Sequence, residues 1–263
     1  SEALEVANIY SVVGQFKVAA GLPRQRPFRQ PHHSASAAAV IGGGTWPRPG
    51  EISLAHRGIL FLDELPEFSR PVLEGLRQPL ENGVVTINRV SGQLIFPAKC
   101  LLLAAMNPCP CGFYGDNRQA CQCSQKQMAN YRRRLSGPLL DRLDSQLTVP
   151  RVPVEDLTGQ IKSESSSDLR QQVIQARKRQ LERFKNTKFV NNGELTVAAI
   201  RDFCQIDQAG QMVLRQAIDK FNLSARGYYR ILRLARTIAD LADEPTIAKI
   251  HITESLQYRF SNY

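Results

Sequence analysis

The chain has 263 residues, of which 43% are hydrophobic and 22% are charged, as in ordinary globular proteins. It holds no run of about 18 apolar residues, and no basic segment followed by an apolar one opens it, so we expect neither a membrane span nor a secretory signal and favour a cytoplasmic protein. The net charge of +10 is shared equally between residues 1–150 and 151–263, which favours a polyanionic partner such as nucleic acid but points to no basic tail.

The first hundred residues alternate between helical and strand patterns. We expect a helix over residues 2–13, a loop rich in Arg, Pro and His over 21–33, and a loop or hairpin tip over 45–50. The pattern then predicts a strand at 59–62 buried on both faces, a helix over 69–81, a β-hairpin from 84–87 and 93–96, and a second buried strand at 100–105.

The second part of the chain changes character. Residues 125–144 are expected to be helical in two pieces broken at Gly137 and Pro138, with a short strand at 147–149. Prolines and serines then replace large apolar residues, and helical patterns follow. We therefore predict an α/β parallel-sheet core over residues 1–150, a linker over 151–168 and a small all-α domain over 169–263.

The strongest functional signal is the segment 58–64, GILFLDE, in which four apolar residues run into two carboxylates. This is a Walker B pattern: the first carboxylate holds Mg²⁺ and the second polarises an attacking water. Asp63 would take the metal role and Glu64 the role of the base. The alternative is a buried strand that ends in a solvated acidic turn.

A polar residue also follows the second predicted strand. Asn107 comes directly after an apolar run, and ligands of open α/β sheets sit outside the carboxyl ends of the strands. Asn107 could therefore orient water against a γ-phosphate, the role called sensor 1. The alternative is a simple strand-ending turn, which the Asn107-Pro108 pair favours by itself.

Two arginine positions complete the pattern. Arg142, on a short helix, could reach the γ-phosphate of a neighbouring subunit, although residues 132–134 compete for that role and a surface pair with Asp141 or Asp144 is the alternative. Arg226 opens a later helix and shares one face with Arg230 and Arg233. That face could close over a nucleotide or could simply be solvated.

In chain order these elements resemble a AAA+ ATPase, and the sequence around them narrows the resemblance. Residues 26–36 (RPFRQPHHSAS), the glycines at 42–44 and residues 49–58 (PGEISLAHRG) look like the magnesium-chelatase-like ComM/YifB family. The match runs from the first helix to the C-terminus and is densest up to residue 150.

The resemblance implies a hexameric ring with ATP and Mg²⁺ at the subunit interfaces. For ComM-type proteins it implies a DNA motor, a branch migration helicase acting in homologous recombination and natural transformation. By the family pattern, Asp63 and Glu64 match Walker B, Asn107 matches sensor 1, Arg142 matches the arginine finger and Arg226 matches sensor 2.

One family motif is missing. The chain has no G-x-x-x-x-G-K-[ST] segment and no Gly-Lys pair, whereas in the family this Walker A loop lies upstream of the residues matched here. The resemblance therefore implies a C-terminal fragment. The backbone amides and the Lys of that loop are the main groups that bind the β- and γ-phosphates, and this chain lacks them. We expect this chain alone to bind ATP poorly and to hydrolyse essentially none.

Four of the six cysteines are close in sequence, in the order Cys109-x-Cys111 and Cys121-x-Cys123. Four thiolates suit tetrahedral Zn²⁺, and a structural site would pin a loop too polar to pack by itself. Free thiols and disulfides are the alternatives. His32 and His33 are also possible ligands, with a loop or capping role as the alternative.

Ring motors of this class grip DNA with hairpins. The candidates here are Trp46 and Arg48 in the glycine-rich loop and Arg89 in the hairpin 84–96, because an aromatic residue beside an Arg suits stacking on bases and contact with phosphate. A tryptophan packed locally is the alternative.

Two other functions compete with a DNA motor. A chelatase-type ATPase subunit would use the same parts to remodel a partner protein and would never touch DNA. A non-catalytic zinc-binding regulatory module is the third possibility.

Overall fold

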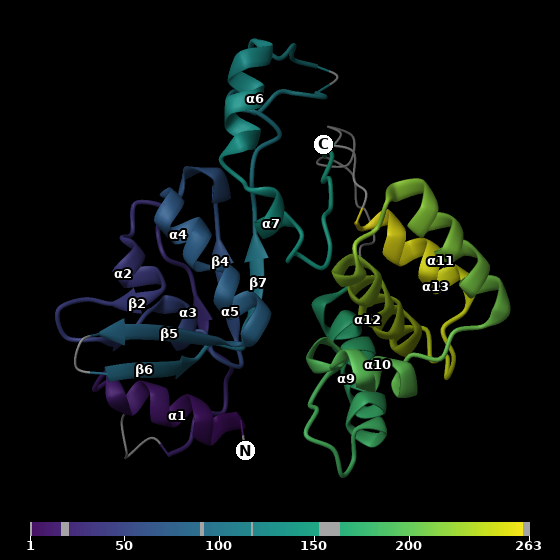
Figure 1. The fold of residues 1–263 in the computed structure, drawn as a ribbon, viewed down its shortest axis with the longest axis horizontal. Helices are drawn as coiled ribbons and strands as arrows, with labels where there is room; N and C mark the ends of the chain where they lie inside the picture. Colours follow the sequence, from purple (N-terminus) through teal and green to yellow (C-terminus); the bar gives the residue numbers. More distant parts are fainter. Residues whose placement is uncertain (1, 17–20, 90–91, 117, 153–163, 260–263) are drawn as a thin grey trace. The chain divides into compact units, whose positions relative to one another are not determined.

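The computed structural model describes residues 2–16, 21–89, 92–116, 118–152 and 164–259. By their contacts the residues divide into two compact units, Ser1–Arg142 and Leu143–Tyr263. The first is an α/β unit built on a parallel sheet and the second is helical, which is the fold class that the sequence predicts (Figure 1). Residues 153–163, most of the predicted linker, lie outside the described residues.

A parallel sheet forms the centre of the first unit. In the described residues its strands are β1 (Phe28–Arg29), β4 (Ile59–Leu62) and β7 (Leu101–Ala104), in the order β1-β4-β7. Leu60 pairs with Arg29 on one side and with Leu102 on the other. Because parallel strands end at the same edge, the segments that follow β4 and β7 are neighbours (Figure 1).

One face of this sheet is not fully buried, so the predictions of a strand at 59–62 buried on both faces and of a second buried strand at 100–105 are wrong for that face, on which Ile59 and Phe61 are only partly buried. Leu60 and Leu62 of β4 have no exposed surface, whereas Leu101 and Leu103 of β7 are 63% and 51% exposed. The register puts these two side chains on the same face as Phe28 and Phe61. Within the described part of the chain, β7 is an edge strand and that face lacks a covering layer.

Short helices cover the other face. They are α2 (Ala37–Val40), α3 (Glu51–Leu54), α4 (Arg70–Gly75) and α5 (Arg77–Asn82), with a 3₁₀ turn, η2, at Leu65–Glu67. The segment predicted as one helix over 69–81 forms two. Pro79 has no N–H to donate to the carbonyl of Gly75, and this gap coincides with the break at Leu76.

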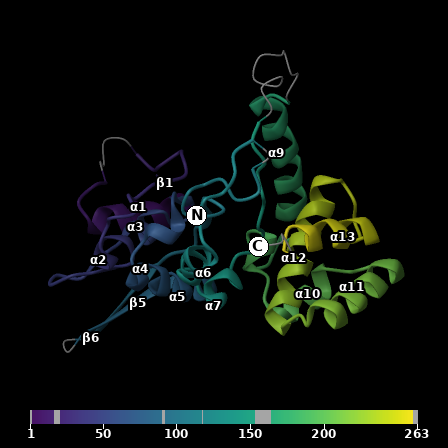
Figure 2. The same ribbon diagram turned by 90° about the horizontal axis from the view of Figure 1, so that it is seen from above.

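Two hairpins extend from the first unit, as the sequence predicts (Figure 2). One joins β2 (Gly42–Gly43) to β3 (Arg48–Pro49), and the other joins β5 (Val84–Arg89) to β6 (Gly92–Pro97). Gly42 has a φ of 113°, and a Cβ there would lie 2.8 Å from the carbonyl oxygen of Arg48. The tight first hairpin therefore needs glycine at this position.

The first helix, α1 (Glu2–Val12), packs against α3, and the hydroxyl of Tyr10 donates to the carbonyl oxygen of Leu54 at 3.1 Å. Farther along, the predicted two-piece helix is present as α6 (Gln125–Arg133) and α7 (Gly137–Leu140). The strand predicted at 147–149 is absent. These described residues pair with no other strand, and Leu147 and Val149 are 63% and 85% exposed.

The second unit contains five longer helices among its described residues. They are α9 (Ser166–Arg183), α10 (Val197–Phe203), α11 (Gln208–Phe221), α12 (Ala225–Leu241) and α13 (Lys249–Gln257), with a 3₁₀ turn, η3, at Asn192–Glu194. The helix α9 thus begins inside the range predicted as linker. No described helix combines the length and apolar character needed to cross a membrane.

A buried ion-pair network holds the second unit together. Asp240 on α12 has no exposed surface, and its carboxylate accepts from Arg183 on α9, Asn192 of η3 and Arg236 one turn earlier on α12. Burial opposes ionisation of Asp240, but these donors outweigh it and hold its pKa below the ordinary value. The network joins three elements around one carboxylate.

Residues 143–146 belong with this unit rather than with the sheet. The carboxylate of Asp144 lies 2.5 Å from the guanidinium of Arg230, and the N–H of Gln146 donates to the carbonyl oxygen of Tyr258. The contact division therefore falls ahead of the predicted core boundary at residue 150.

Candidate nucleotide and metal sites

The two carboxylates of the Walker B segment follow β4 directly, where the sheet ends. Asp63 and Glu64 are both exposed, and the N–H of Glu64 donates to the Asp63 carboxylate at 2.9 Å. Glu64 has the left-handed backbone conformation, with φ 51° and ψ 46°, which costs roughly 1–2 kcal/mol in a residue with a side chain. Such strain is typical of functional turns, where the surrounding structure imposes the direction of one side chain.

Glu64 is held by a residue that the sequence did not single out as its partner. The Nδ1 atom of His33 lies 3.0 Å from the Oε2 atom of Glu64. His33 follows β1, the strand paired with β4, so the parallel register brings the two segments to the same sheet edge. The neighbouring His32 contacts the hydroxyl of Ser34 at 2.9 Å, a local loop role.

Asn107 lies at the adjacent strand end. Leu62 of β4 pairs with Ala104 of β7, and the ladder continues as the N–H of Leu65 donates to the carbonyl of Ala105 at 3.0 Å. Asn107 comes two residues later and is exposed. The structure therefore brings Asp63, Glu64 and Asn107 to one edge of the sheet, where a phosphate group and a metal ion could lie between them.

Arg142 does not point freely into solvent. Its guanidinium pairs with the carboxylate of Glu81 on α5 and donates to the carbonyl oxygen of Pro138 at 2.6 Å. The sequence predicts a pair with Asp141 or Asp144 as the alternative, whereas the structure pairs Arg142 with Glu81. A role toward a neighbouring subunit would require Arg142 to exchange this partner.

The competing arginines at residues 132–134 have different surroundings. Arg134 pairs with Glu67 at 2.5 Å, and Arg132 lies over the ring of Tyr114, 5.4 Å from its centroid. Arg133 is exposed.

The three α12 arginines predicted to share a face do not form one solvated face. Arg226 is exposed in the first turn, whereas Arg230 pairs with Asp144 and Arg233 donates to the carbonyl oxygen of Leu195 at 2.6 Å. Burial lowers the pKa of Arg233. Arg226 belongs to the second unit, so its action at the sheet edge of the first unit stays a proposal.

The four cysteines of the polar loop converge on one point. The sulfur of Cys109 lies 3.4 Å from that of Cys111 and 3.6 Å from that of Cys121, and all four sulfurs, including that of Cys123, lie within 4.8 Å of one another. Four sulfurs at about 2.3 Å from a tetrahedral zinc ion are about 3.8 Å apart. The cluster is thus close to the size that Zn²⁺ requires.

The local backbone favours a thiolate in this cluster. Hydrogen bonds from the backbone N–H groups of Phe113 and Gln122 lower the pKa of the Cys111 thiol to about 6. Desolvation and the neighbouring sulfurs raise the pKa of Cys123 to about 12. A bound cation would relieve the crowding of four sulfurs by stabilising all of them as thiolates.

The two remaining cysteines are apart from the cluster. Cys204 is buried, and Cys100 packs against the hydrophobic core of the first unit, where burial raises its thiol pKa to about 12.

The candidate nucleic-acid residues lie on the two hairpins of the first unit. Trp46 is 80% exposed between β2 and β3, so the alternative of local packing does not hold for it, and Arg48 beside it is also exposed. Arg89 ends β5, but its side chain lies outside the described part of the structure. The hairpins are neighbours, since a Cβ at Gly42 would lie 3.4 Å from the side chain of Ile87.

Comparison with known proteins places this chain in a family. Residues 1–157 match the profile described as magnesium chelatase, subunit ChlI, and residues 163–259 match the profile of the ChlI C-terminal region. The chain belongs to the magnesium chelatase ChlI family. The predicted resemblance is thereby confirmed, and with it membership of a AAA+-type family.

The chain is also similar to curated proteins over nearly its whole length. The chain is 46% identical over 261 residues to Competence protein ComM of Haemophilus influenzae and 44% identical over 259 residues to Uncharacterized protein YifB of Escherichia coli. Each alignment covers 98% of this chain and 50% of the relative. The chain therefore spans about half the length of the curated relatives it matches.

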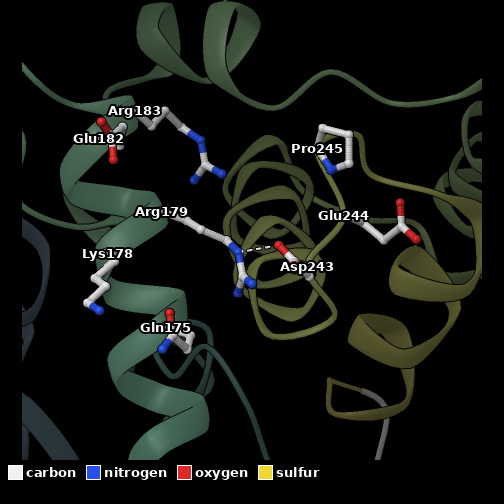
Figure 3. Close-up of a pocket in the computed structure, with 8 residues that line it drawn as sticks. All are labelled: Gln175, Lys178, Arg179, Glu182, Arg183, Asp243, Glu244 and Pro245. Atoms are coloured by element: carbon white, nitrogen blue, oxygen red, sulfur yellow. Dashed lines mark ion pairs between the residues drawn. The ribbon is translucent and has the colours of Figure 1, made fainter.

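A hollow on the helical unit of this chelatase-family chain contains none of the candidate residues. It lies between α9 and the turn after α12, and Arg179 and Asp243 pair there at 2.5 Å (Figure 3). Its charged walls of both signs include Lys178, Arg183 and Glu244. We interpret the hollow as a salt-bridged junction between helices.

Sequence reasoning missed His33 and Glu81 as partners of candidate residues. The strand β1 has only two residues, so its pattern is too short to reveal that His33 would end beside Glu64. A motif search for carboxylates could not find Glu81, because its pairing with Arg142 joins α5 to a segment 61 residues later.

Proposed function

We propose that this chain contributes the metal-binding carboxylate, the catalytic base, the water-orienting amide and the lid of a AAA+-type ATPase motor that acts on DNA as a hexameric ring. The observation that carries the proposal is the placement of Asp63, Glu64 and Asn107 at adjacent ends of parallel strands in a chelatase-family chain. Asp63 would hold Mg²⁺, Glu64 would polarise the attacking water and Asn107 would orient it.

Arg142 and Arg226 would act on the nucleotide from other elements. An arginine near a transferring phosphoryl group stabilises charge that grows in the transition state. Arg142 would do so from the neighbouring subunit and Arg226 from the helical unit. The chain lacks the G-x-x-x-x-G-K-[ST] loop, so we expect hydrolysis only in the full-length protein, meaning a chain extended to the length of its relatives and carrying that loop.

DNA is the proposed polymer for three reasons. The net charge is +10, the exposed Trp46 stands beside Arg48 on a hairpin, and a relative is named Competence protein ComM. By the family resemblance the motor would promote branch migration. We also propose that Cys109, Cys111, Cys121 and Cys123 hold one structural Zn²⁺.

The family description favours a second function, an ATPase subunit that remodels a partner protein. Binding and stimulation by branched DNA separate the two. We expect ATP hydrolysis by the full-length protein to rise when a four-way DNA junction is added, with binding that weakens steeply as salt is raised. A rate of ATP hydrolysis that DNA does not change at any salt concentration would contradict the DNA motor and support the chelatase-type function.

A further inference from the structure

The cysteine cluster and α6 form one projecting module, residues 107–135, beyond the carboxyl end of β7 (Figure 1). Cys123 directly precedes Ser124, whose side chain accepts from the N–H of Gln127 while the Gln127 side chain accepts from the N–H of Ser124. The fourth sulfur of the cluster is therefore one residue from a capped helix start.

A second contact joins the loop to the helix. The guanidinium of Arg132 on α6 lies 5.4 Å from the ring centroid of Tyr114 in the loop, and Tyr114 is still 48% exposed. The loop and the helix are thus fixed to each other both at the cluster and at this stacked pair.

Helix α6 buries Tyr131, and the side opposite to this residue carries positive charge. Tyr131 and Leu135 are buried. Lys126, Asn130 and Arg133 fall at i, i+4 and i+7, so they share the opposite side, and all three are exposed.

Acidic groups are almost absent from the module. Helix α6 has no Asp or Glu, and the sequence 107–135 contains one carboxylate, Asp116. One oxygen of that carboxylate accepts the N–H groups of Arg118 and Gln119. The described side chains leave a surface of cations and amides with one exposed aromatic ring.

We propose that this side of the module binds the phosphate backbone of nucleic acid through Lys126 and Arg133, with Tyr114 placed to stack on a base. The proposal rests on the proposed DNA function and names a contact separate from the two hairpins. Among nearby carboxylates, Glu67 pairs with Arg134 and Asp116 accepts from its own loop, and within the described residues neither forms an ion pair with Lys126 or Arg133. Cations and amides of this kind contact phosphate, and an aromatic ring backed by an arginine suits an unpaired base. An acidic protein surface would also pair with Lys126 and Arg133, but it offers no base to stack on the ring of Tyr114.

The test is a direct binding measurement on the 263-residue chain, which does not depend on hydrolysis. A fluorescein-labelled oligonucleotide, single-stranded or duplex, is titrated by fluorescence anisotropy over a range of salt concentrations. The variant is Lys126→Ala with Arg133→Ala, and the matched control is Arg215→Ala with Lys220→Ala, two exposed cations of α11. Circular dichroism checks folding, and light scattering follows the oligomeric state.

The expected result is a fall in the slope of log affinity against log salt by about two for the Lys126/Arg133 variant, and a much smaller change for the control. A Tyr114→Ala variant should weaken single-strand binding more than duplex binding. Equal losses in variant and control would overturn this surface while leaving DNA binding intact. A changed oligomeric state with unchanged affinity would also overturn it and would mark a subunit contact. If the chain binds no oligonucleotide, both this surface and the DNA part of the proposed function fail, while ATP hydrolysis stays testable.

Discussion

His33 lies 3.0 Å from Glu64, through its Nδ1 atom and the Oε2 atom of the carboxylate. The Glu64 side chain is 53% exposed, so without a partner it would sample several rotamers. The contact fixes the carboxylate that we assign as the base and connects the loop after β1 to the turn after β4. His33 is therefore a positioning residue in our account.

Replacing His33 tests this positioning role. In the full-length protein, His33→Leu should lower kcat roughly 10- to 100-fold with a smaller effect on KM, because a misplaced base affects the chemical step more than substrate binding. His33→Asn should restore much of the rate, since its amide nitrogen occupies nearly the place of Nδ1. Equal losses in both variants, or a loss confined to KM, would argue against positioning.

Arg142 is predicted to act across a subunit interface. Arg142→Ala should lower the hydrolysis rate of the full-length protein by roughly 10³- to 10⁵-fold, the usual effect of losing an arginine finger. Mixing Arg142→Ala subunits with Glu64→Gln subunits should then restore activity, because some interfaces combine an intact Glu64 with an intact Arg142. An inactive mixture that still forms mixed rings would show that Arg142 does not act on the neighbour.

The pH dependence of stability in the first unit should follow Glu5 and His56. Glu5 accepts from Arg57 at 2.8 Å and contacts His56 at 2.9 Å, and the Arg57 hydrogen bond is the main cause of a Glu5 pKa lowered from 4.5 to about 2. Its folded-state pKa is below the unfolded one, so its stabilisation is present above pH 4.5 and is lost as pH falls toward 2.

His56 adds an earlier acid-sensitive step. Burial lowers its pKa from 6.5, so the unfolded chain takes up a proton more readily than the folded one, and stability falls as pH drops through 6.5. Urea unfolding across pH should show both steps. Glu5→Gln should remove most of the lower one, whereas Glu182→Gln in the second unit should leave it. A profile unchanged by Glu5→Gln would contradict this assignment.

Much of the sheet edge could be predicted from sequence because its signals are local. An apolar run followed by carboxylates or by Asn marks the end of a strand. Because β4 and β7 are parallel, the residues that follow them lie at the same edge of the sheet. The exposure of Leu101 and Leu103 could not be predicted, because β-branched and leucine-rich strands look alike whether one face or both faces are covered.

Errors elsewhere also have physical causes. The segment 147–149 has strand-like residues, but a strand needs a partner, and the nearby backbone bond from Gln146 goes to the end of α13 at Tyr258. The partners of Glu64 and Arg142 come from elements that are distant in sequence. One sequence by itself does not show which of these distant elements lie side by side. The cysteine cluster was predictable because the two pairs are only nine residues apart.

The cysteine cluster should hold one zinc ion per chain, measured by elemental analysis of the purified protein. Cys111→Ser should lose the metal and loosen the loop and the start of α6, because a structural zinc site supplies folding free energy directly. Cys204→Ala, a buried cysteine outside the cluster, should keep the metal. Metal-free wild-type protein with an ordered loop would contradict the zinc assignment.

The measurement that tests the central claim most directly is phosphate release from ATP by the full-length protein, for the wild type, Glu64→Gln and Glu182→Gln. Our account predicts hydrolysis in the wild type and in Glu182→Gln, and a loss of roughly 10²- to 10⁴-fold in Glu64→Gln with ATP still bound, because the amide cannot polarise the attacking water. Hydrolysis that survives Glu64→Gln, or a folded, ATP-bound wild type that releases no phosphate, would contradict the assignment of this sheet edge as the site of hydrolysis.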